Sequence, residues 1–172
     1  MAKRPPDPAN GNAPVARQVP MRDFSRSLPM SLLRAREAVM RQFRPKLREH
    51  GLTEQQWRIL RALAAIEAAE VTELARTAFL LGPSLSRILR DLEARNLIER
   101  RTAKSDQRRS MVSISKDGVK LMASVAPSSE AIYAEITQRF GARKLAELQE
   151  MLGELEQSLA GLGAADGASA EE

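Results

Sequence analysis

Serine and arginine side chains that can donate several hydrogen bonds gather in the middle of the sequence. A first group follows a glycine–proline pair and consists of Ser84, Ser86, Arg87 and Arg90. A second group, further along the chain, places a carboxylate before two guanidinium groups, those of Asp106, Arg108 and Arg109. Such donors bind phosphate oxygens and base edges, and the carboxylate can hold one guanidinium extended while the other enters an electronegative groove. The two groups therefore predict contact with a nucleic acid.

The charge around these residues agrees with that prediction without requiring it. Residues 82–110 include eight basic and four acidic residues. The whole chain has 27 basic and 22 acidic residues, which gives a net charge of +5. A net positive segment suits a polyanionic partner. On charge alone, a solvated charged helix explains the segment equally well.

The composition argues against an enzyme. The absence of cysteine excludes disulfides, thiolate nucleophiles and iron–sulfur ligation, and the single histidine, His50, leaves little for a zinc site. The sequence contains neither a glycine-rich dinucleotide motif nor a P-loop, nor a nucleophile with a recognisable base. We expect no catalytic residue, no metal and no cofactor.

The length and the hydropathy predict one soluble domain between two tails. The chain has 172 residues, 43% of them hydrophobic, and we identify neither a signal peptide nor a membrane-spanning segment, which predicts a cytoplasmic protein without membrane contact. Residues 1–25 are rich in proline and predict a disordered tail. Residues 163–172 predict a second, acidic disordered tail.

Residues 26–52 predict an N-terminal dimerisation helix. Its apolar residues recur at helical spacing and are Leu28, Leu32, Val39, Phe43 and Leu47. Pro45 predicts a kink or a break, because proline lacks the N–H that a helix interior requires. Gly51 followed by Leu52 predicts that the helix ends near His50 in a left-handed cap.

Residues 53–115 predict a lobe that contains two short, adjacent helices. Thr53 and Gln56 form a capping-box pattern that opens a helix extending to about residue 65, and Thr72 is expected to cap a brief helix after it. Pro83 suits the first turn of the next helix, after a turn over residues 79–82. The second of the two short helices would expose the first group of donors, as in a helix-turn-helix.

A hairpin is predicted directly after this pair. Asn96 tolerates a left-handed conformation and ends the second helix. Residues 97–101 and 110–114 alternate as strands do, so that residues 102–109 form a basic hairpin loop. A helix-turn-helix with such a hairpin has the winged-helix plan, in which one helix enters the major groove and the wing tip reaches phosphates or the minor groove. We expect a mainly α fold with a two-stranded β wing.

Residues 116–162 predict C-terminal dimerisation helices. Ser115 is expected to cap the first, which Pro127 interrupts or kinks, and Gly141 opens the second. The second has leucines spaced alternately by three and four residues, at Leu145, Leu148, Leu152, Leu155, Leu159 and Leu162. Such a seam packs against another helix. Packing within the chain is one alternative, but we expect a homodimer interface that also includes the first helix.

Several segments of the lobe carry a family resemblance. They are Val71–Ala75, Pro83–Leu89, Leu92–Glu93, Leu97–Arg100 and Asp106–Arg109. The chain resembles the multiple-antibiotic-resistance regulator (MarR) family over about residues 26–162. Four further segments resemble the branch that represses homoprotocatechuate (3,4-dihydroxyphenylacetate) degradation operons, namely Ser27–Met30, Leu33–Glu37, Phe43–Pro45 and Leu47–Arg58. Asn96 departs from the family pattern, because relatives usually have glycine there.

The resemblance implies a homodimeric transcriptional regulator, most simply a repressor of an aromatic-compound catabolic operon. It would bind a palindromic operator in double-stranded DNA and leave it when a small aromatic or phenolic effector binds. The lack of cysteine argues against the peroxide-sensing branch and the single histidine against the zinc-sensing one. The alternative is an architectural winged-helix protein without an effector.

In this family the effector occupies a crevice between the dimerisation helices and the DNA-binding lobe. The resemblance therefore points to residues on the first two helices that could hold an acid and its ring, which are Met30, Arg34, Arg36, His50, Trp57 and Arg61. Each has an alternative role. Trp57 suits core packing, His50 suits a helix C-terminus, and each arginine could be a surface charge.

Overall fold

The computed structural model describes residues 23–103 and 106–160, without the side chains of residues 102–109. The chain divides into two compact units, residues 1–40 and residues 41–172. Both predicted tails, except for residues 23–25, lie outside the described residues, as does Leu162.

The first unit contains a short 3-10 helix, Phe24–Arg26, and the first part of helix α1, Leu28–Glu49. Asp23 caps the short helix by accepting a hydrogen bond from the Ser25 backbone at 2.8 Å. Hydrogen bonds from the Ser25 side chain and backbone lower the pKa of the Asp23 carboxyl. Five large apolar residues of this unit are exposed, namely Phe24, Leu28, Leu32, Leu33 and Val39.

The second part of α1 begins the second unit. Phe43 and Leu47 are buried there. The helix continues through Pro45, so of the predicted kink or break the break is wrong. Pro45 is exposed, where water can replace the missing helical hydrogen bond. The cap is confirmed, since Gly51 has φ +65° and the Leu52 backbone donates to the Leu47 carbonyl at 2.9 Å.

Helix α2, Glu54–Ala64, forms the centre of the lobe. Its predicted capping box is confirmed, because Gln56 N donates to Thr53 Oγ1 at 3.2 Å and Thr53 N to Gln56 Oε1 at 2.8 Å. The helix buries most of its apolar residues, namely Trp57, Ile59, Leu60 and Leu63. Burial of this face holds α2 against the other elements of the lobe.

Helices α3, Val71–Thr77, and α4, Gly82–Ala94, form the predicted pair. Pro83 lies in the first turn of α4 as expected, but Thr72 does not cap α3, whose N-cap is Glu70. The cause is a third strand that the sequence did not reveal. Strand β1, Ala69–Glu70, keeps the chain extended up to the start of α3.

The sheet has three antiparallel strands in the order β1–β3–β2. Strands β2, Ile98–Ala103, and β3, Asp106–Ile114, pair beyond the predicted bounds, at Thr102↔Ser110 and, after a shift in register, at Ala103↔Asp106. The predicted loop over residues 102–109 is therefore wrong. Backbone groups make the ladder, so polar and basic residues can extend a hairpin that projects from the lobe.

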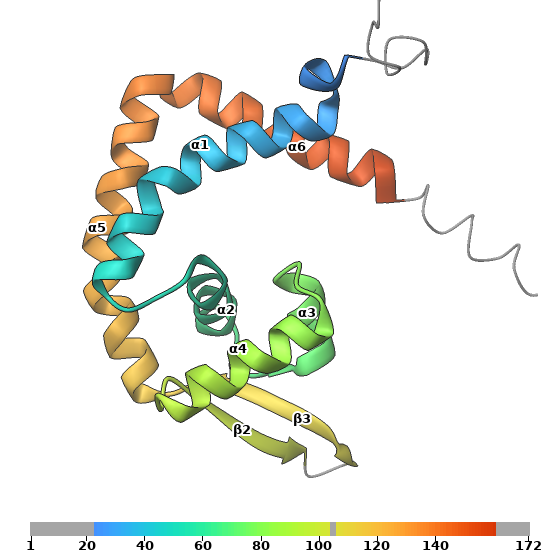
Figure 1. Cartoon of the computed structure of the whole chain (residues 1–172), viewed down its shortest axis with the longest axis vertical. Helices are drawn as coiled ribbons and strands as arrows, with labels where there is room; N and C mark the ends of the chain where they lie inside the picture. The colour runs from blue at the N-terminus through green and yellow to red at the C-terminus, as the bar shows by residue number, and fades with distance from the viewer. Residues whose placement is uncertain (1–22, 104–105, 161–172) are drawn as a thin grey trace, which may run out of the picture. The chain divides into compact units, whose positions relative to one another are not determined.

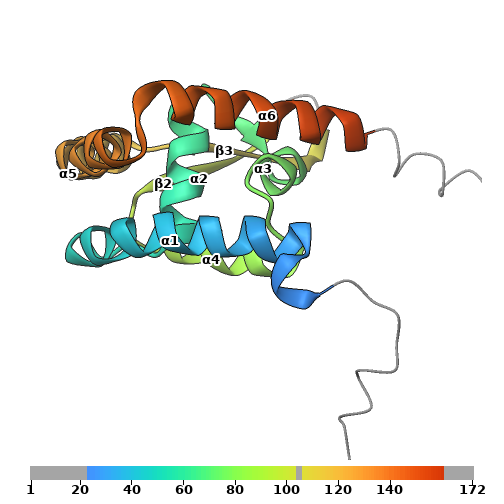
Figure 2. The same ribbon diagram turned by 90° about the horizontal axis from the view of Figure 1, so that it is seen from above.

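Helix α5, Lys116–Phe140, leads from the sheet to α6, Ala142–Ala160 (Figure 1). The Ser115 cap is confirmed, since Ser115 Oγ accepts a hydrogen bond from Gly118 N at 2.9 Å. Pro127 lies within one continuous helix rather than interrupting it. Figure 2 shows α5 almost end-on while α6 extends across the view, so that the two helices meet at a steep angle after Gly141.

Candidate functional site

The first predicted group of donors lies on the outer face of α4. Ser84, Ser86, Arg87 and Arg90 are exposed, whereas Leu85, Leu89 and Leu92 of the same helix are buried in the lobe. The helical period separates the two sets of residues, so that burial of the leucines presents the polar side chains to solvent. This arrangement gives α4 a face that can contact a groove of DNA.

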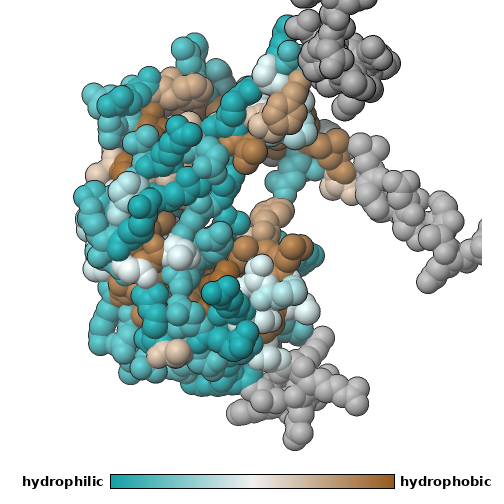
Figure 3. Space-filling view, in the orientation of Figure 1, coloured by the Kyte–Doolittle hydropathy of each residue, from teal (hydrophilic) through white to brown (hydrophobic). Residues whose placement is uncertain are grey.

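Two apolar side chains that the sequence did not single out lie at the turn before α4. Phe79, with φ +50°, and Leu81 are both 79% exposed. Leu81 occupies the N-cap position of α4, and a leucine side chain cannot accept hydrogen bonds from the first N–H groups of the helix. Figure 3 shows hydrophobic surface in this part of an otherwise mostly hydrophilic lobe.

The second predicted group lies in the hairpin. Asp106, Arg108 and Arg109 belong to strand β3 and not to a loop, and their side chains lie outside the described residues. On the neighbouring strand β2, Arg101 forms an ion pair with Glu99 at 2.7 Å. The described backbone thus places the second group on the projecting hairpin.

Polar contacts join α2 to both helices of the helix-turn-helix. Gln56 Nε2 donates to Asp91 Oδ2 of α4 at 2.6 Å. Arg58 Nη1 donates to the Ala78 carbonyl, at the end of α3, at 2.9 Å. Glu54 receives hydrogen bonds from Arg58 and from Arg44 of α1. These contacts tie the position of α2 to that of the helix pair.

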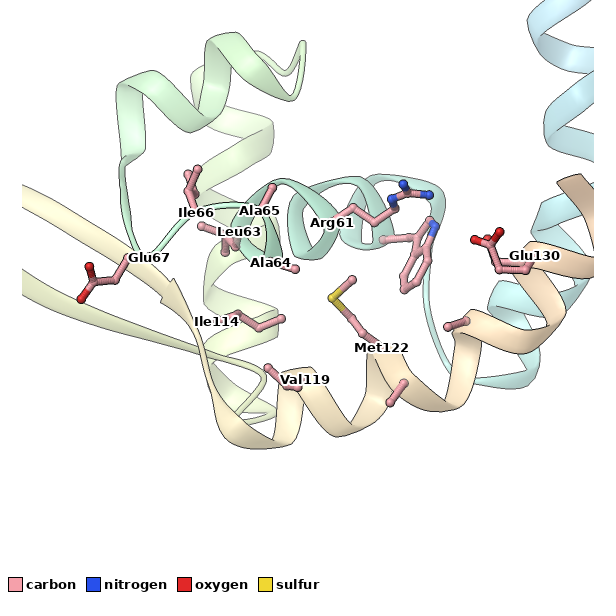
Figure 4. A pocket seen from close by; sticks show the side chains of 14 residues that line it. Arg61, Leu63, Ala64, Ala65, Ile66, Glu67, Ile114, Val119, Met122 and Glu130 are labelled. Carbon is pink, nitrogen blue, oxygen red and sulfur yellow. The ribbon is translucent and has the colours of Figure 1, made fainter. Parts of the chain in front are cut away.

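A cavity of about 690 Å³ lies between α2 and α5. Trp57 and Arg61 line it from α2, and Met122, Ser129 and Glu130 line it from α5. Figure 4 shows Arg61 and Glu130 towards one end of the cavity and the Met122 side chain between the two helices. Towards the other end the walls are mostly apolar, formed by Leu63, Ala64, Ala65, Ile66, Ile114 and Val119, with Glu67 as the charged residue there. The cavity therefore suits an amphipathic ligand.

A tyrosine and a phenylalanine surround the guanidinium end of this cavity. Arg61 Nη1 donates to the Tyr133 hydroxyl at 3.3 Å. The Tyr133 ring in turn contacts that of Phe43, with centroids 4.9 Å apart. Arg61 remains exposed and so can turn towards an anionic ligand, whereas Trp57 is 8% exposed and serves both the core and the cavity wall.

Of the six predicted effector residues, Trp57 and Arg61 lie together on the wall of this cavity. His50 is not among the residues lining the cavity, and its Nδ1 lies 3.2 Å from Ser124 Oγ of α5. Met30, Arg34 and Arg36 belong to the first unit, where Arg36 pairs with Glu37 at 2.9 Å. Tyr133, Ser129 and Glu130 were not predicted.

The predicted leucine seam faces away from the core of the chain. Helix α6, which is described along its whole length, buries none of its residues. Leu148, Leu152 and Leu159 are 36%, 40% and 49% exposed, and Leu145 and Leu155 are half-buried. A single chain thus leaves much of the apolar surface of α6 in contact with water.

Residues 23–103 and 106–160 offer neither a membrane span nor a metal site. None of the helices in these ranges combines the length and the apolar character that a membrane-spanning segment requires. The same residues contain no cluster of three or more histidine, cysteine or acidic side chains that could bind a metal ion.

Comparison with known proteins identifies the family. Residues 50–109 match the model of the MarR family. The homoprotocatechuate degradative operon repressor of Escherichia coli is 41% identical over 128 residues, which are 74% of this chain and 86% of that protein. The chain therefore belongs to the MarR family of transcriptional regulators, which are DNA-binding proteins and not enzymes.

Solved structures agree with this assignment. NadR in complex with 4-hydroxyphenylacetate is 36% identical with a TM-score of 0.69, and the match covers 80% of this chain and 97% of NadR. The repressor CouR bound to a 23-mer DNA duplex is 26% identical with a TM-score of 0.71, over 76% of this chain and 93% of CouR. The predicted winged-helix fold is confirmed, with one strand more than expected.

Proposed function

We propose that this protein is a homodimeric repressor that releases its operator when a small aromatic or phenolic acid occupies the cavity between α2 and α5. One observation carries the proposal: α2 lines the cavity with Trp57 and Arg61 and also bonds to α4 through Gln56 and Asp91. A ligand in the cavity thus touches a helix that is tied to the DNA-contacting helix. The regulated genes would serve aromatic catabolism, as the name of the Escherichia coli relative suggests.

We assign the DNA contacts to α4 and to the hairpin. Ser84, Ser86, Arg87 and Arg90 would enter the major groove, and Arg108 and Arg109, with Asp106, would reach phosphates or the adjacent minor groove. The exposure of the four α4 side chains supports this assignment. CouR, a structural relative, binds duplex DNA.

The dimer is proposed to form through the helical parts outside residues 53–115, the DNA-binding lobe. These parts are residues 26–52 and 116–162. Exposed apolar side chains on α6, among them Leu152 and Leu159, support it, because a coiled-coil seam left in water favours association. A two-fold dimer would bind a palindromic operator with half-sites about 34–36 Å apart, one turn of DNA.

The ligand is inferred from the two ends of the cavity. Arg61 can bind a carboxylate in a bidentate manner, and Trp57 with Met122 provides a wall for an aromatic ring. NadR, whose sequence is 36% identical, was solved with 4-hydroxyphenylacetate. An acid of this type can place its carboxylate on Arg61, at the end of the cavity that also contains Glu130, and its ring against the apolar side chains.

Release requires the ligand to bind more tightly to a lobe arrangement that no longer fits the operator. If the ligand weakens DNA binding tenfold, a coupling of ~1.4 kcal/mol, DNA must weaken ligand binding by the same factor. Measuring both affinities therefore tests the mechanism twice.

The experiment measures binding of the purified protein to DNA duplexes from the region upstream of its own gene. Fluorescence anisotropy is recorded at a stated salt concentration, with and without a panel of phenolic acids. Tight, sequence-selective binding that one acid relieves is expected. Equal binding to every duplex, unaffected by any acid, would contradict the proposal and favour the architectural alternative.

A further inference from the structure

One buried hydroxyl on the cavity wall lacks a hydrogen-bond partner. Ser129 of α5 is 4% exposed, and within the described part of the chain its Oγ has no partner. The residue lines the cavity between α2 and α5. Leaving a buried hydroxyl unsatisfied costs free energy, so a position of this kind is expected to bond to whatever fills the cavity.

The other hydroxyl side chains of α5 show that the helix itself could have satisfied Ser129. Ser124, Ser128 and Thr137 each donate to a backbone carbonyl three or four residues earlier, at 2.7, 2.9 and 2.8 Å. Such bonds are the usual arrangement for serine and threonine within a helix. The Ser129 hydroxyl makes no such bond, and although its oxygen is buried, a rotation about χ1 to another staggered rotamer can turn it towards a ligand.

The position of Ser129 relative to Arg61 indicates how long a ligand must be to contact both residues. Tyr133, whose hydroxyl lies 3.3 Å from Arg61 Nη1, is four residues after Ser129 and therefore on the same face of α5, about 6 Å along the helix axis. A ligand whose carboxylate lies on Arg61 would extend along α5 past Ser129. The distance along the axis is comparable to the length of a substituted benzene ring.

We infer that Ser129 hydrogen-bonds a ring hydroxyl of the effector whose carboxylate is bound by Arg61, and so selects hydroxylated aromatic acids over unsubstituted ones. The inference rests on the proposed function, because it concerns the same cavity. It adds a specificity-determining residue that neither the sequence motifs nor the comparisons assign. Besides Ser129, the charged side chains that line the cavity are Arg61, Glu67 and Glu130, and a site with few polar partners can discriminate by the presence of a ring hydroxyl.

The test is isothermal titration calorimetry of the full chain with four probes: phenylacetate, 3-hydroxyphenylacetate, 4-hydroxyphenylacetate and 3,4-dihydroxyphenylacetate. The wild type is expected to bind at least one hydroxylated acid about tenfold more tightly than phenylacetate. Ser129→Ala should lose that preference and bind phenylacetate as tightly as the wild type does. Ser128→Ala is the matched control, because that hydroxyl is bonded to the Val125 carbonyl, and it should behave as wild type.

Three results would overturn the inference in distinguishable ways. If Ser129→Ala keeps the preference for the hydroxylated acid, another residue binds the ring hydroxyl. If the variant weakens all four acids equally, Ser129 only shapes the cavity. If the wild type binds none of the acids while it still binds its operator, the proposed effector class fails and the role of Ser129 fails with it.

Discussion

Replacing Gly118 by alanine should destabilise the junction between the wing and α5. An alanine Cβ at this position would lie 2.2 Å from the Leu97 carbonyl oxygen and 2.7 Å from Cγ1 of Ile114, whereas real Cβ atoms are essentially never found within 3.0 Å. The Leu97 oxygen cannot rotate away, because it is a backbone atom that also accepts a hydrogen bond from Ser115 N at 3.1 Å. The start of α5 must therefore move away from the base of the hairpin.

The cost follows from two opposing effects. Overpacking of this kind costs about 1–3 kcal/mol, and a backbone obstacle places Gly118→Ala near the upper end. The greater helix propensity of alanine stabilises the helix by about 1 kcal/mol and so offsets part of this cost. The free energy of unfolding should therefore fall by about 2 kcal/mol, which for a chain of this length lowers Tm by roughly 4–8 °C.

The assay is thermal unfolding followed by circular dichroism at one fixed protein concentration, because the proposed dimerisation would make Tm depend on concentration. Gly82→Ala is the matched control, since a Cβ there meets nothing within 4 Å, and its Tm should stay the same or rise slightly. If Gly118→Ala also left Tm unchanged, the close approach of α5 to Leu97 would be refuted.

Three further substitutions test the proposed surfaces. Arg108→Ala should weaken operator binding at least tenfold in anisotropy with native circular dichroism, whereas Arg139→Ala, an exposed arginine of α5, should not. Arg87→Ala should cost about 1–3 kcal/mol of discrimination between operator and random DNA; equal losses on both would instead assign Arg87 to a phosphate. Leu152→Lys should convert the dimer to a monomer in light scattering, and an unchanged dimer mass would contradict the α6 interface.

Features set by neighbouring residues were predictable from the sequence. The Thr53–Gln56 capping box, the Ser115 cap and the left-handed residues Gly51 and Asn96 all follow from a side chain or a backbone angle acting within a few residues. Such signals need no knowledge of the rest of the fold. The helix boundaries that depend on them were accordingly close to those observed.

Features set by distant partners were missed. Strand β1 has only two residues, Ala69 and Glu70, and exists because they pair with Val112 and Met111. A segment this short has no periodicity to recognise, and the Thr72 cap was predicted because the strand was not. The extent of the hairpin failed for the same reason, since strand pairing and not residue polarity sets where it ends.

In the candidate cavity too, some residues could be predicted from the sequence while others depend on distant partners. A step of one residue turns a side chain by ~100°, and this step separates Gln56, bonded to Asp91 of α4, from Trp57, which lines the cavity. Family resemblance pointed to Trp57 and Arg61 because it concerns residue types at given positions. It could not supply Ser129, whose role depends on α5 lying opposite α2 and on a hydrogen bond that the helix does not make. The unsatisfied hydroxyl of Ser129 is therefore a feature that only the packed structure can reveal.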